Sequence, residues 1–293
     1  MVNQTAAKLS PGLYLVATPI GTARDITLRA LDLLRAADVI AAEDTRSLRK
    51  LLDIHGIPLE GRPLVAYHDH SKTSVRERLL QDISAGKSVV YASEAGTPMV
   101  ADPGYDLAGD AIASGLPLIS APGPSAVIAA LTLSGLPTDR FFFAGFLPNA
   151  SGKRKNALKD VASVPGTLAF YESPKRVAAM LRDAAEVLGP TRRAVVCREL
   201  TKKFEEVLRG TLEDLAAVCA SRTLKGEIVV LVDRGGLPNV DEADLDSVLR
   251  DVLREKSVRD AADEVAAQLG LKRRQVYQRA LQLAQDGAEE GDV

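Results

Sequence analysis

The sequence predicts two consecutive α/β domains followed by a small helix-turn-helix module. Three observations predict this order: strands alternate with helices over roughly the first 125 residues, two strands follow one another directly near residue 200, and two amphipathic helices lie near the C-terminus. Regular alternation is typical of parallel sheets with crossover helices, whereas directly joined strands are typical of antiparallel pairs. We expect the N-terminal domain over 1–136, the second domain over 137–234 and the module over 243–285.

The N-terminal domain is predicted to be a doubly wound parallel sheet. Short runs of Val, Ile, Leu and Ala predict buried strands, and the segments between them have apolar residues three and four positions apart, the spacing of a helix. Gly56, Gly86 and Gly115 lie where three of these helices are expected to end. The expected strands are 13–18, 39–42, 63–67, 88–93 and 116–121, and the expected helices are 27–37, 45–55, 71–86, 102–115 and 122–135.

The second domain is predicted to have a mixed sheet and a basic surface. Strands are expected at 167–173, 192–200, 203–211 and 226–233, and helices at 151–163 and after Pro174 and Thr211. Because 203–211 follows 192–200 directly, these two strands are expected to pair antiparallel. Residues 139–210 hold 14 Lys and Arg against 8 Asp and Glu, a net charge of +6, whereas the whole chain is at −2. Contact with a polyanion is therefore expected from this region and not from a global positive field.

The C-terminal module is predicted to follow a polar linker over 234–246. Two helices within 257–285, joined by a Leu-Gly turn, have the spacing of a helix-turn-helix. Their apolar faces are Ala262, Val265, Ala266 and Leu269 in the first helix, and Val276, Ala280 and Leu283 in the second. Residues 240–293 carry 8 basic against 13 acidic side chains, a net charge of −5. Since an autonomous DNA-binding domain is usually more basic, we expect an auxiliary module that contacts nucleic acid.

Composition and the positions of the cysteines and histidines indicate the expected cellular compartment and whether a metal site is expected. The 293 residues are 46% hydrophobic and 26% charged, as in globular proteins. We interpret the two cysteines, Cys197 and Cys219, as small buried hydrophobic side chains in a reducing compartment, and no Cys and His cluster has metal-ligand spacing. The polar N-terminus lacks the apolar core of a signal peptide, and prolines and glycines interrupt the most apolar stretch, 115–137. A cytosolic protein without a membrane span is therefore expected.

Three loops rich in glycine and proline follow predicted strands of the N-terminal domain. They are TPIGTARDIT, SEAGTPMVADPG and SAPGPSA, at 18–27, 93–104 and 120–126. Ligands bind at the carboxyl ends of parallel strands, so together the loops predict one crevice. None has the G-x-G-x-x-G or G-x-x-x-x-G-K-[ST] pattern that holds phosphates, which disfavours NAD and nucleoside triphosphates.

Further polar clusters follow other predicted strands. His68 and His70 lie at the same carboxyl edge, where a local hydrogen-bonding pair is the favoured interpretation over a catalytic one. Two adjacent basic residues in each of 170–177 (FYESPKRV) and 198–206 (RELTKKFEE) are compatible with a solvated helix start or with a polyanion-binding face. At the start of the second C-terminal helix, three basic residues are positioned to touch phosphate: Lys272, Arg273 and Arg274.

Between Leu13 and Asp233 the chain contains a specific string of motifs. In order they are LYLVATPIGTARDITLRAL, AAEDTR, YHDH, SEAGTPMVADPG, APGPSA, FYESPKR, RELTK and KGE. Together they resemble the bacterial S-adenosylmethionine-dependent methyltransferases of the tetrapyrrole methylase superfamily that act on small-subunit ribosomal RNA, at a ribose 2′-oxygen of a cytidine. This subfamily also carries a C-terminal helix-turn-helix. The resemblance implies a cytoplasmic homodimer of two-domain α/β protomers with the cofactor in the cleft between the domains.

The resemblance also implies cofactor-binding residues from both domains. They are Pro19, Ile20, Glu94, Ala95, Gly96, Thr97, Met99, Ser125, Ala126, Tyr171, Lys225, Gly226 and Glu227, with Asp102 nearby. The family usually has Asp at position 94, so the carboxylate here is one methylene longer. S-adenosylmethionine has no phosphate and carries a sulfonium cation, which agrees with loops that allow close backbone approach and supply carboxylates.

Methyl transfer to a ribose hydroxyl requires positioning and a general base within about 3 Å of the hydroxyl. The sequence does not choose among the candidates Glu94, Asp102, His68, His70 and Glu172. Basic residues expected to contact RNA are Arg24, Arg46, Lys175, Arg176, Lys202, Lys272, Arg273 and Arg274. The expected substrate is small-subunit ribosomal RNA or the assembled small ribosomal subunit.

Two other functions stay open. One is a small-molecule tetrapyrrole methyltransferase of the precorrin type, against which the helix-turn-helix and the RELTK segment argue. The other is a ligand-sensing DNA-binding regulator, which the acidic balance of the C-terminal region disfavours.

Overall fold

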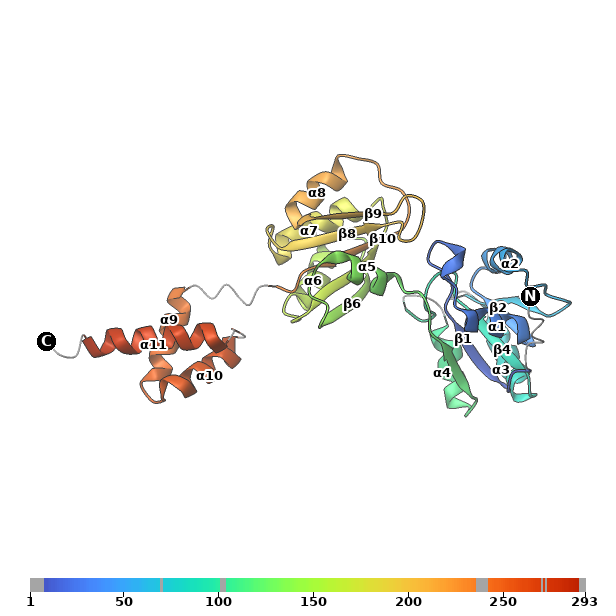
Figure 1. The fold of residues 1–293 in the computed structure, drawn as a ribbon, viewed down its shortest axis with the longest axis horizontal. Helices are drawn as coiled ribbons and strands as arrows, with labels where there is room; N and C mark the ends of the chain where they lie inside the picture. The colour runs from blue at the N-terminus through green and yellow to red at the C-terminus, as the bar shows by residue number, and fades with distance from the viewer. Residues whose placement is uncertain are drawn as a thin grey trace. The chain divides into compact units, whose positions relative to one another are not determined.

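The computed structural model shows two five-stranded sheets with flanking helices and a unit of three helices (Figure 1). It describes residues 8–68, 71–100, 104–235, 242–269, 271 and 273–289. The chain divides into two compact units after Asp233. Both sheets belong to the first unit, and the three helices belong to the second.

The first sheet is entirely parallel. Its strands are β1 (Gly12–Val16), β2 (Val39–Ala42), β3 (Leu64–Ala66), β4 (Ser88–Ala92) and β5 (Leu118–Ala121), in the order β3-β2-β4-β1-β5. The intervening helices are η1 (Ala23–Asp25), α1 (Leu28–Ala36), α2 (Thr45–Ile54), α3 (Thr73–Ser84) and α4 (Tyr105–Ala113). These elements confirm the predicted alternation and the predicted parallel sheet.

Helices cover both faces of this sheet, as strand β1 illustrates. Successive strand side chains point to opposite faces. Tyr14 and Val16 pack in a buried cluster with residues of α1 and α2, whereas Leu13 packs in a second cluster with residues of α3 and α4. The sheet is therefore buried on both sides, which explains why its strands are continuous apolar runs.

The second sheet is mixed. Its strands are β6 (Phe141–Phe146), β7 (Thr167–Glu172), β8 (Arg193–Arg198), β9 (Glu206–Thr211) and β10 (Ile228–Val232), in the order β6-β7-β10-β8-β9. Strands β8 and β9 pair antiparallel, as predicted, and only β6 and β7 pair in parallel. Its helices are α6 (Ser151–Val161), α7 (Val177–Leu188) and α8 (Leu212–Ala220).

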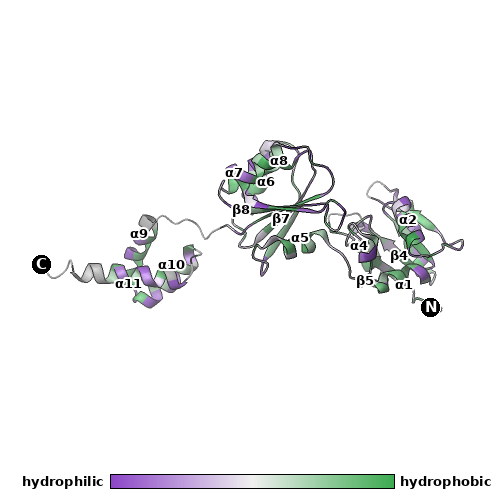
Figure 2. Ribbon diagram, turned by 45° about the horizontal axis from the view of Figure 1, so that its top comes forward, coloured by the Kyte–Doolittle hydropathy of each residue, from purple (hydrophilic) through white to green (hydrophobic). Residues whose placement is uncertain are grey.

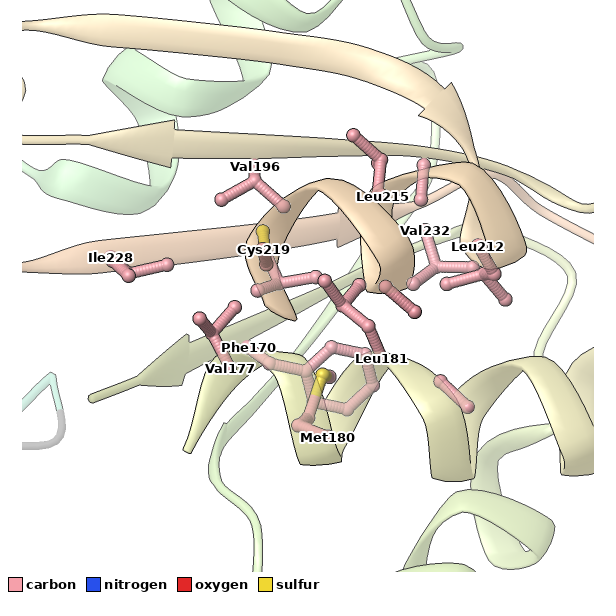
Figure 3. Packing of buried hydrophobic residues seen from close by; sticks show 14 of the residues in the cluster. Phe170, Val177, Met180, Leu181, Val196, Leu212, Leu215, Cys219, Ile228 and Val232 are labelled. Carbon is pink, nitrogen blue, oxygen red and sulfur yellow. The ribbon is translucent and has the colours of Figure 1, made fainter. Parts of the chain in front are cut away.

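One face of the second sheet packs against these three helices. Figure 3 shows Phe170 of β7 and Val196 of β8 directed toward Met180 of α7 and Cys219 of α8. Phe170 and Met180 are both fully buried. The thiol of Cys219 thus serves as a small apolar group, and Cys197 is buried as well, which confirms the predicted state of both cysteines.

Helix α5 (Ala126–Ser134) follows β5 in the chain but packs against the second sheet. Val127 and Leu131 join a buried cluster with Val195 and Val229 of that sheet. Figure 2 shows α5 on the opposite side of the sheet from α6 and α7. The loop between β5 and α5 therefore leads from the first sheet to the second, a position that strand and helix periodicity does not reveal.

Strand β6 was absent from the sequence-based expectation. Its sequence FFFAGF lacks the alternation of apolar and polar residues that identifies a half-buried strand. It lies at the edge of the sheet and pairs only with β7. Phe141, Phe142 and Phe146 are all exposed there. Pairing with β7 thus makes this segment a strand, and that pairing depends on tertiary structure.

The C-terminal unit contains three helices rather than the two that were expected. They are α9 (Glu242–Leu253), α10 (Val258–Leu269) and α11 (Arg273–Glu289). The apolar faces predicted for the last two helices meet in one core, to which α9 adds the buried Leu249. Arg279 of α11 holds Asp246 through two charge-assisted bonds of 2.7 and 2.6 Å. The start of α9 was wrongly assigned to the linker because its first half is strongly acidic.

The predicted fold class is confirmed: a parallel α/β sheet, a mixed α/β sheet and a C-terminal helical unit. Within the described part of the chain, no helix is both long and apolar enough to span a bilayer.

Candidate active site

The three glycine-rich loops meet at the carboxyl edge of the first sheet, as predicted. Thr18 N donates to Gly96 O at 2.9 Å, and Gly96 N donates to Thr18 O at 3.0 Å. Thr97 Oγ1 donates to Pro124 O at 2.9 Å, which joins the second loop to the third. The strands bring their ends to one edge, and these hydrogen bonds fix the loops relative to each other.

The second loop requires glycine where it approaches the first. Gly96 has a φ of +86°, a conformation that side chains disfavour. A Cβ at this position would also lie 3.4 Å from Ile20 Cγ2. The buried Thr18 hydroxyl lies 3.1 Å from Ser93 O and 3.2 Å from Glu94 O, so it anchors the start of the same loop.

A cavity of about 440 Å³ is bounded by these loops and by the second sheet. Ten of the predicted cofactor residues line it: Ile20, Glu94, Ala95, Gly96, Thr97, Ser125, Ala126, Tyr171, Gly226 and Glu227. Pro19, Met99 and Lys225 are not among the lining residues, although each neighbours one in the chain. Of the general-base candidates, Glu94 and Glu172 line the cavity and His68 does not. His70 and Asp102 lie outside the described residues.

Nine further residues that were not predicted from the sequence also line the cavity. They are Glu43, Val100, Phe146, Ser173, Pro174, Cys197, Leu200, Ile228 and Val229. Glu43 could have been found, because it follows β2 at the same carboxyl edge as the three loops. By contrast, Cys197 and Ile228 belong to strands of the second sheet, and only tertiary packing brings them to the cavity.

Carboxylates gather where the second loop meets the end of β2. Glu94 N donates to Glu43 Oε2 at 3.2 Å. Partial burial raises the pKa of Glu94 above its ordinary value, and the negative charges of Glu43, Asp44 and Glu227 raise it further. Asp44 itself caps α2 by accepting from Arg46 N at 2.7 Å and Ser47 N at 3.3 Å, which lowers its pKa. Glu94 therefore protonates at a higher pH than an ordinary glutamate.

Glu172 differs from Glu94 because its side chain is completely buried. Its Oε1 accepts from Ser173 N at 2.7 Å. Its Oε2 lies 3.2 Å from Nη2 of Arg176, but that group donates to Leu147 O at 2.6 Å. Within the described part of the chain, Oε2 accepts no hydrogen bond. A buried acceptor without a donor at a cavity is suited to a donor group of a ligand.

On the second domain, Lys202 is held between two carboxylates. Its Nζ lies 2.9 Å from Glu199 Oε1 and 2.9 Å from Glu227 Oε2. Although burial opposes its charge, the bonds to Glu199 and Glu227 raise the pKa of Lys202, and the hydrogen bond from Lys202 lowers that of Glu199. Gly226 passes so close that a Cβ there would overlap the Glu199 carboxyl group. These contacts fix the KGE turn at the cavity.

The segment after β8 also contacts the first loop. Thr22 N donates to Thr201 Oγ1 at 3.2 Å, and Gly21 leaves no room for a Cβ beside Thr201 and Lys202. Glu199 and Thr201 have φ values of +52° and +62°, which residues other than glycine seldom adopt. The contacts around this segment therefore hold it in an unfavourable backbone conformation.

The basic residues expected to contact RNA occupy three kinds of environment. Five are exposed: Arg24, Arg46, Lys175, Arg273 and Arg274. Arg176 and Lys202 are half-buried and engaged with Glu172 and with Glu199 and Glu227 as described above. Arg273 forms an ion pair with Asp263 and lies 5.8 Å from the ring centroid of Tyr277. Lys272 lies outside the described residues.

His68 is exposed, and its backbone N–H donates to Ser71 Oγ at 2.9 Å. The residues that the structure describes contain no group of three or more His, Cys, Asp or Glu able to hold a metal ion.

The arrangement of two sheets with this cavity defines a class of protein. Residues 12–216 match the family described as Tetrapyrrole (Corrin/Porphyrin) Methylases. The solved structure of the methyltransferase CobJ has a TM-score of 0.60 at 21% identity, covering 77% of this chain and 95% of that one. The uroporphyrin-III C-methyltransferase from Thermus thermophilus, complexed with S-adenosylhomocysteine, has a TM-score of 0.53 at 22% identity, covering 75% and 96%. The chain has the fold of this class.

More similar relatives define the family within the class. A protein of Mesorhizobium japonicum named ribosomal RNA small subunit methyltransferase I is 48% identical over 100% of this chain and 99% of its own length. Residues 239–284 match the RsmI C-terminal HTH domain. This chain belongs to the ribosomal RNA small subunit methyltransferase I family. The predicted family and the predicted kind of enzyme, a methyltransferase, are therefore confirmed, and the main prediction is favoured over the two alternatives.

Proposed function

We propose that this protein transfers a methyl group from S-adenosylmethionine to the ribose 2′-oxygen of a cytidine in small-subunit ribosomal RNA. One observation carries the proposal: the cavity between the three loops and the second sheet, in a chain of this methyltransferase family. The name of the Mesorhizobium relative supports the RNA substrate, and the S-adenosylhomocysteine of the Thermus structure supports the cofactor.

The cavity suits a cationic ligand without phosphates. Among the described residues that line it, four are glutamates and none is Lys, Arg or His; the glutamates are Glu43, Glu94, Glu172 and Glu227. Such a surface repels a phosphate and attracts a sulfonium or an ammonium group. Gly96 and Gly226 allow close backbone approach. The Oε2 of Glu172, which accepts no hydrogen bond from the described residues, is available to an amino or hydroxyl donor.

The ten predicted cofactor residues that line the cavity are proposed to hold S-adenosylmethionine. Pro19, Met99 and Lys225 would then support their lining neighbours instead of contacting the cofactor. When bound, S-adenosylmethionine supplies an electrophilic methyl group on a positively charged sulfur. The residues of this chain would contribute by positioning the reactants and by accepting a proton.

Two carboxylates that line the cavity, Glu172 and Glu94, are proposed to have different roles. Glu172 is completely buried, so it can reach a small ligand in the cavity but not a ribose of a large RNA. Glu94 is exposed, and its raised pKa makes it a better proton acceptor near neutral pH than an ordinary carboxylate. Glu94 would therefore take the proton from the 2′-hydroxyl, and Glu172 would orient the cofactor.

The exposed basic side chains are proposed to contact the phosphates of the RNA. In the first unit these are Arg24 and Arg46, which follow β1 and β2, and Lys175, which follows β7. Lys202 is already neutralised by two carboxylates, so we expect it to position the KGE turn more than to bind phosphate. In the helical unit Arg274 is exposed, and Arg273 is paired with Asp263.

A homodimer in the cytoplasm, acting on the assembled small subunit or its RNA, completes the proposal. Sedimentation or light scattering of the purified chain tests the dimer, and a monomer at micromolar concentration would contradict it.

A methyl-transfer assay tests the main proposal. With labelled S-adenosylmethionine, label is expected in unmethylated small ribosomal subunits or in their RNA, at a nucleotide whose 3′-phosphodiester becomes resistant to alkali. Glu94→Gln is expected to abolish transfer but to lower cofactor affinity only in part, because it keeps the shape of a lining residue while it removes one of four negative charges at the cavity. Absence of label in every assembly state of the subunit, or label on a base, would overturn the proposal.

A further inference from the structure

We infer that Phe204, together with Lys203, forms a stacking site for an unpaired base of the RNA substrate beside the cavity. The inference rests on the proposed RNA substrate and adds a recognition residue to it. The two residues lie in the segment between β8 and β9, within RELTKKFEE.

The side chain of Phe204 is 62% exposed. A single exposed aromatic residue is common on protein surfaces and has no functional meaning by itself. Here, however, the ammonium group of Lys203 lies 5.6 Å from the centroid of the Phe204 ring. A cation beside an exposed aromatic face combines attraction to phosphate with a surface on which a base can stack.

The position of Phe204 relative to the cavity supports this role. Leu200, four residues earlier, lines the cavity, and Thr201 accepts the hydrogen bond from Thr22 of the first loop. Thr201 N also donates to Glu205 Oε2 at 2.6 Å, so the residues on both sides of Phe204 are fixed. The aromatic ring is therefore presented from a constrained segment at the border of the proposed reaction site.

Charge distinguishes Lys203 from its neighbour. Lys202 forms ion pairs with Glu199 and Glu227, whereas Lys203 forms no ion pair with any residue that the structure describes. Its charge is thus available to a nucleic-acid phosphate. Single-stranded RNA presents unstacked bases next to phosphates, and base stacking on an aromatic side chain contributes about 1–3 kcal/mol. A fully paired duplex has no base to offer.

Fluorescence provides a direct test, because the chain contains no tryptophan. In the F204W variant, single-stranded polycytidylate is expected to quench the indole emission saturably, and a fully paired RNA duplex of equal length is not. Adding K203A should weaken the quenching and reduce its dependence on salt. The matched control is F141W, at another exposed phenylalanine, on the edge strand β6. Equal quenching at the two positions, or quenching by the duplex alone, would overturn the inference.

Kinetics separate recognition from folding and from cofactor binding. F204A is expected to raise the half-saturating concentration of small ribosomal subunits by about 5- to 150-fold, which corresponds to stacking of one base. Its affinity for S-adenosylmethionine and its thermal midpoint should stay unchanged. F204Y should restore the wild-type value, and F204L, which is apolar but not aromatic, should not. Wild-type behaviour of F204L or F204A would refute the stacking role. Absence of methyl transfer by the wild-type protein would instead refute the proposed function, and the quenching experiment would still decide the stacking.

Discussion

Thr18 and Gly96 are joined by a pair of backbone hydrogen bonds of 2.9 and 3.0 Å, although 77 residues separate them in the chain. Each residue belongs to a loop that follows a strand of the first sheet, and the pair forms a short antiparallel bridge between the loops. The Thr18 side chain adds contacts to the carbonyl oxygens of Ser93 and Glu94. This bridge joins two of the loops that line the cavity.

Thr18→Val tests the importance for stability and ligand binding of the side-chain contacts that accompany this bridge. The substitution keeps the shape but removes a buried hydroxyl, so we expect a loss of about 1–3 kcal/mol in the free energy of unfolding. Affinity for S-adenosylmethionine should fall as the second loop loosens. Denaturant unfolding and titration calorimetry measure the two effects. Thr132→Val, which removes an exposed hydroxyl on α5, is the control and should change neither quantity appreciably. Equal effects of the two substitutions would contradict the prediction.

Gly226→Ala tests the close approach of the KGE turn to Glu199. The new methyl group would overlap the Glu199 carboxyl group and disturb its bond to Lys202. We expect reduced stability together with at least a tenfold loss of cofactor affinity. Gly86→Ala is a matched control, because Gly86 has a φ of +89° against +94° at Gly226 but has open space around it. Gly86→Ala should lower the free energy of unfolding by only about 1–2 kcal/mol, the cost of a side chain in a left-handed backbone conformation, and should leave cofactor binding intact. Similar cofactor affinities in the two variants would exclude the proposed role of the contact.

The pH dependence of methyl transfer tests Glu94 as the proton acceptor. A base is active when deprotonated, and the pKa of Glu94 is raised, so activity should be present above that pKa and fall as the pH drops through it. This loss should therefore begin at a higher pH than an ordinary glutamate would give. Glu43→Gln removes a neighbouring negative charge and should shift the acid limb of kcat/KM to lower pH. Glu77→Gln, at an exposed position on α3, is the control. An unchanged acid limb in Glu43→Gln would argue against Glu94.

Thiol labelling tests the state of the two cysteines. Burial raises the pKa of Cys197 to about 11 and also raises that of Cys219. The thiolate is the reactive form, so both residues should resist iodoacetamide at pH 8 in the folded protein and react after denaturation. Rapid labelling of Cys219 in the native protein at that pH would show that the second sheet and α8 separate, because Cys219 is buried between them and does not line the cavity.

Truncation after Asp233 tests the independence of the C-terminal unit. All residues that line the cavity lie before that position, and the chain divides there into two compact units. The truncated protein should keep its affinity for S-adenosylmethionine and bind small ribosomal subunits more weakly. Equal loss of both affinities would show that the helical unit is required for the fold of the cavity.

The sequence by itself determined the alternation of strands and helices, the three loops and the motif string from which the family could be predicted. Regularly spaced apolar residues predict helices and strands because each such element buries one face. Parallel strands place the loops at their carboxyl ends along one edge of the sheet, so the grouping of the loops could also be predicted. The motif string, through the family that it resembles, also named the cofactor-binding candidates, ten of which the structure brings to one cavity.

Tertiary structure alone decided several other features. Strand β6 has no alternation of apolar and polar residues, so it depends on the strand with which it pairs. The contributions of Cys197 and Ile228 to the cavity arise only because α5 carries the chain from the first sheet to the second. The sequence also did not reveal that Glu94 is exposed whereas the side chain of Glu172 is buried. Desolvation and neighbouring charge depend on distances between residues far apart in the chain, and only the folded structure sets those distances.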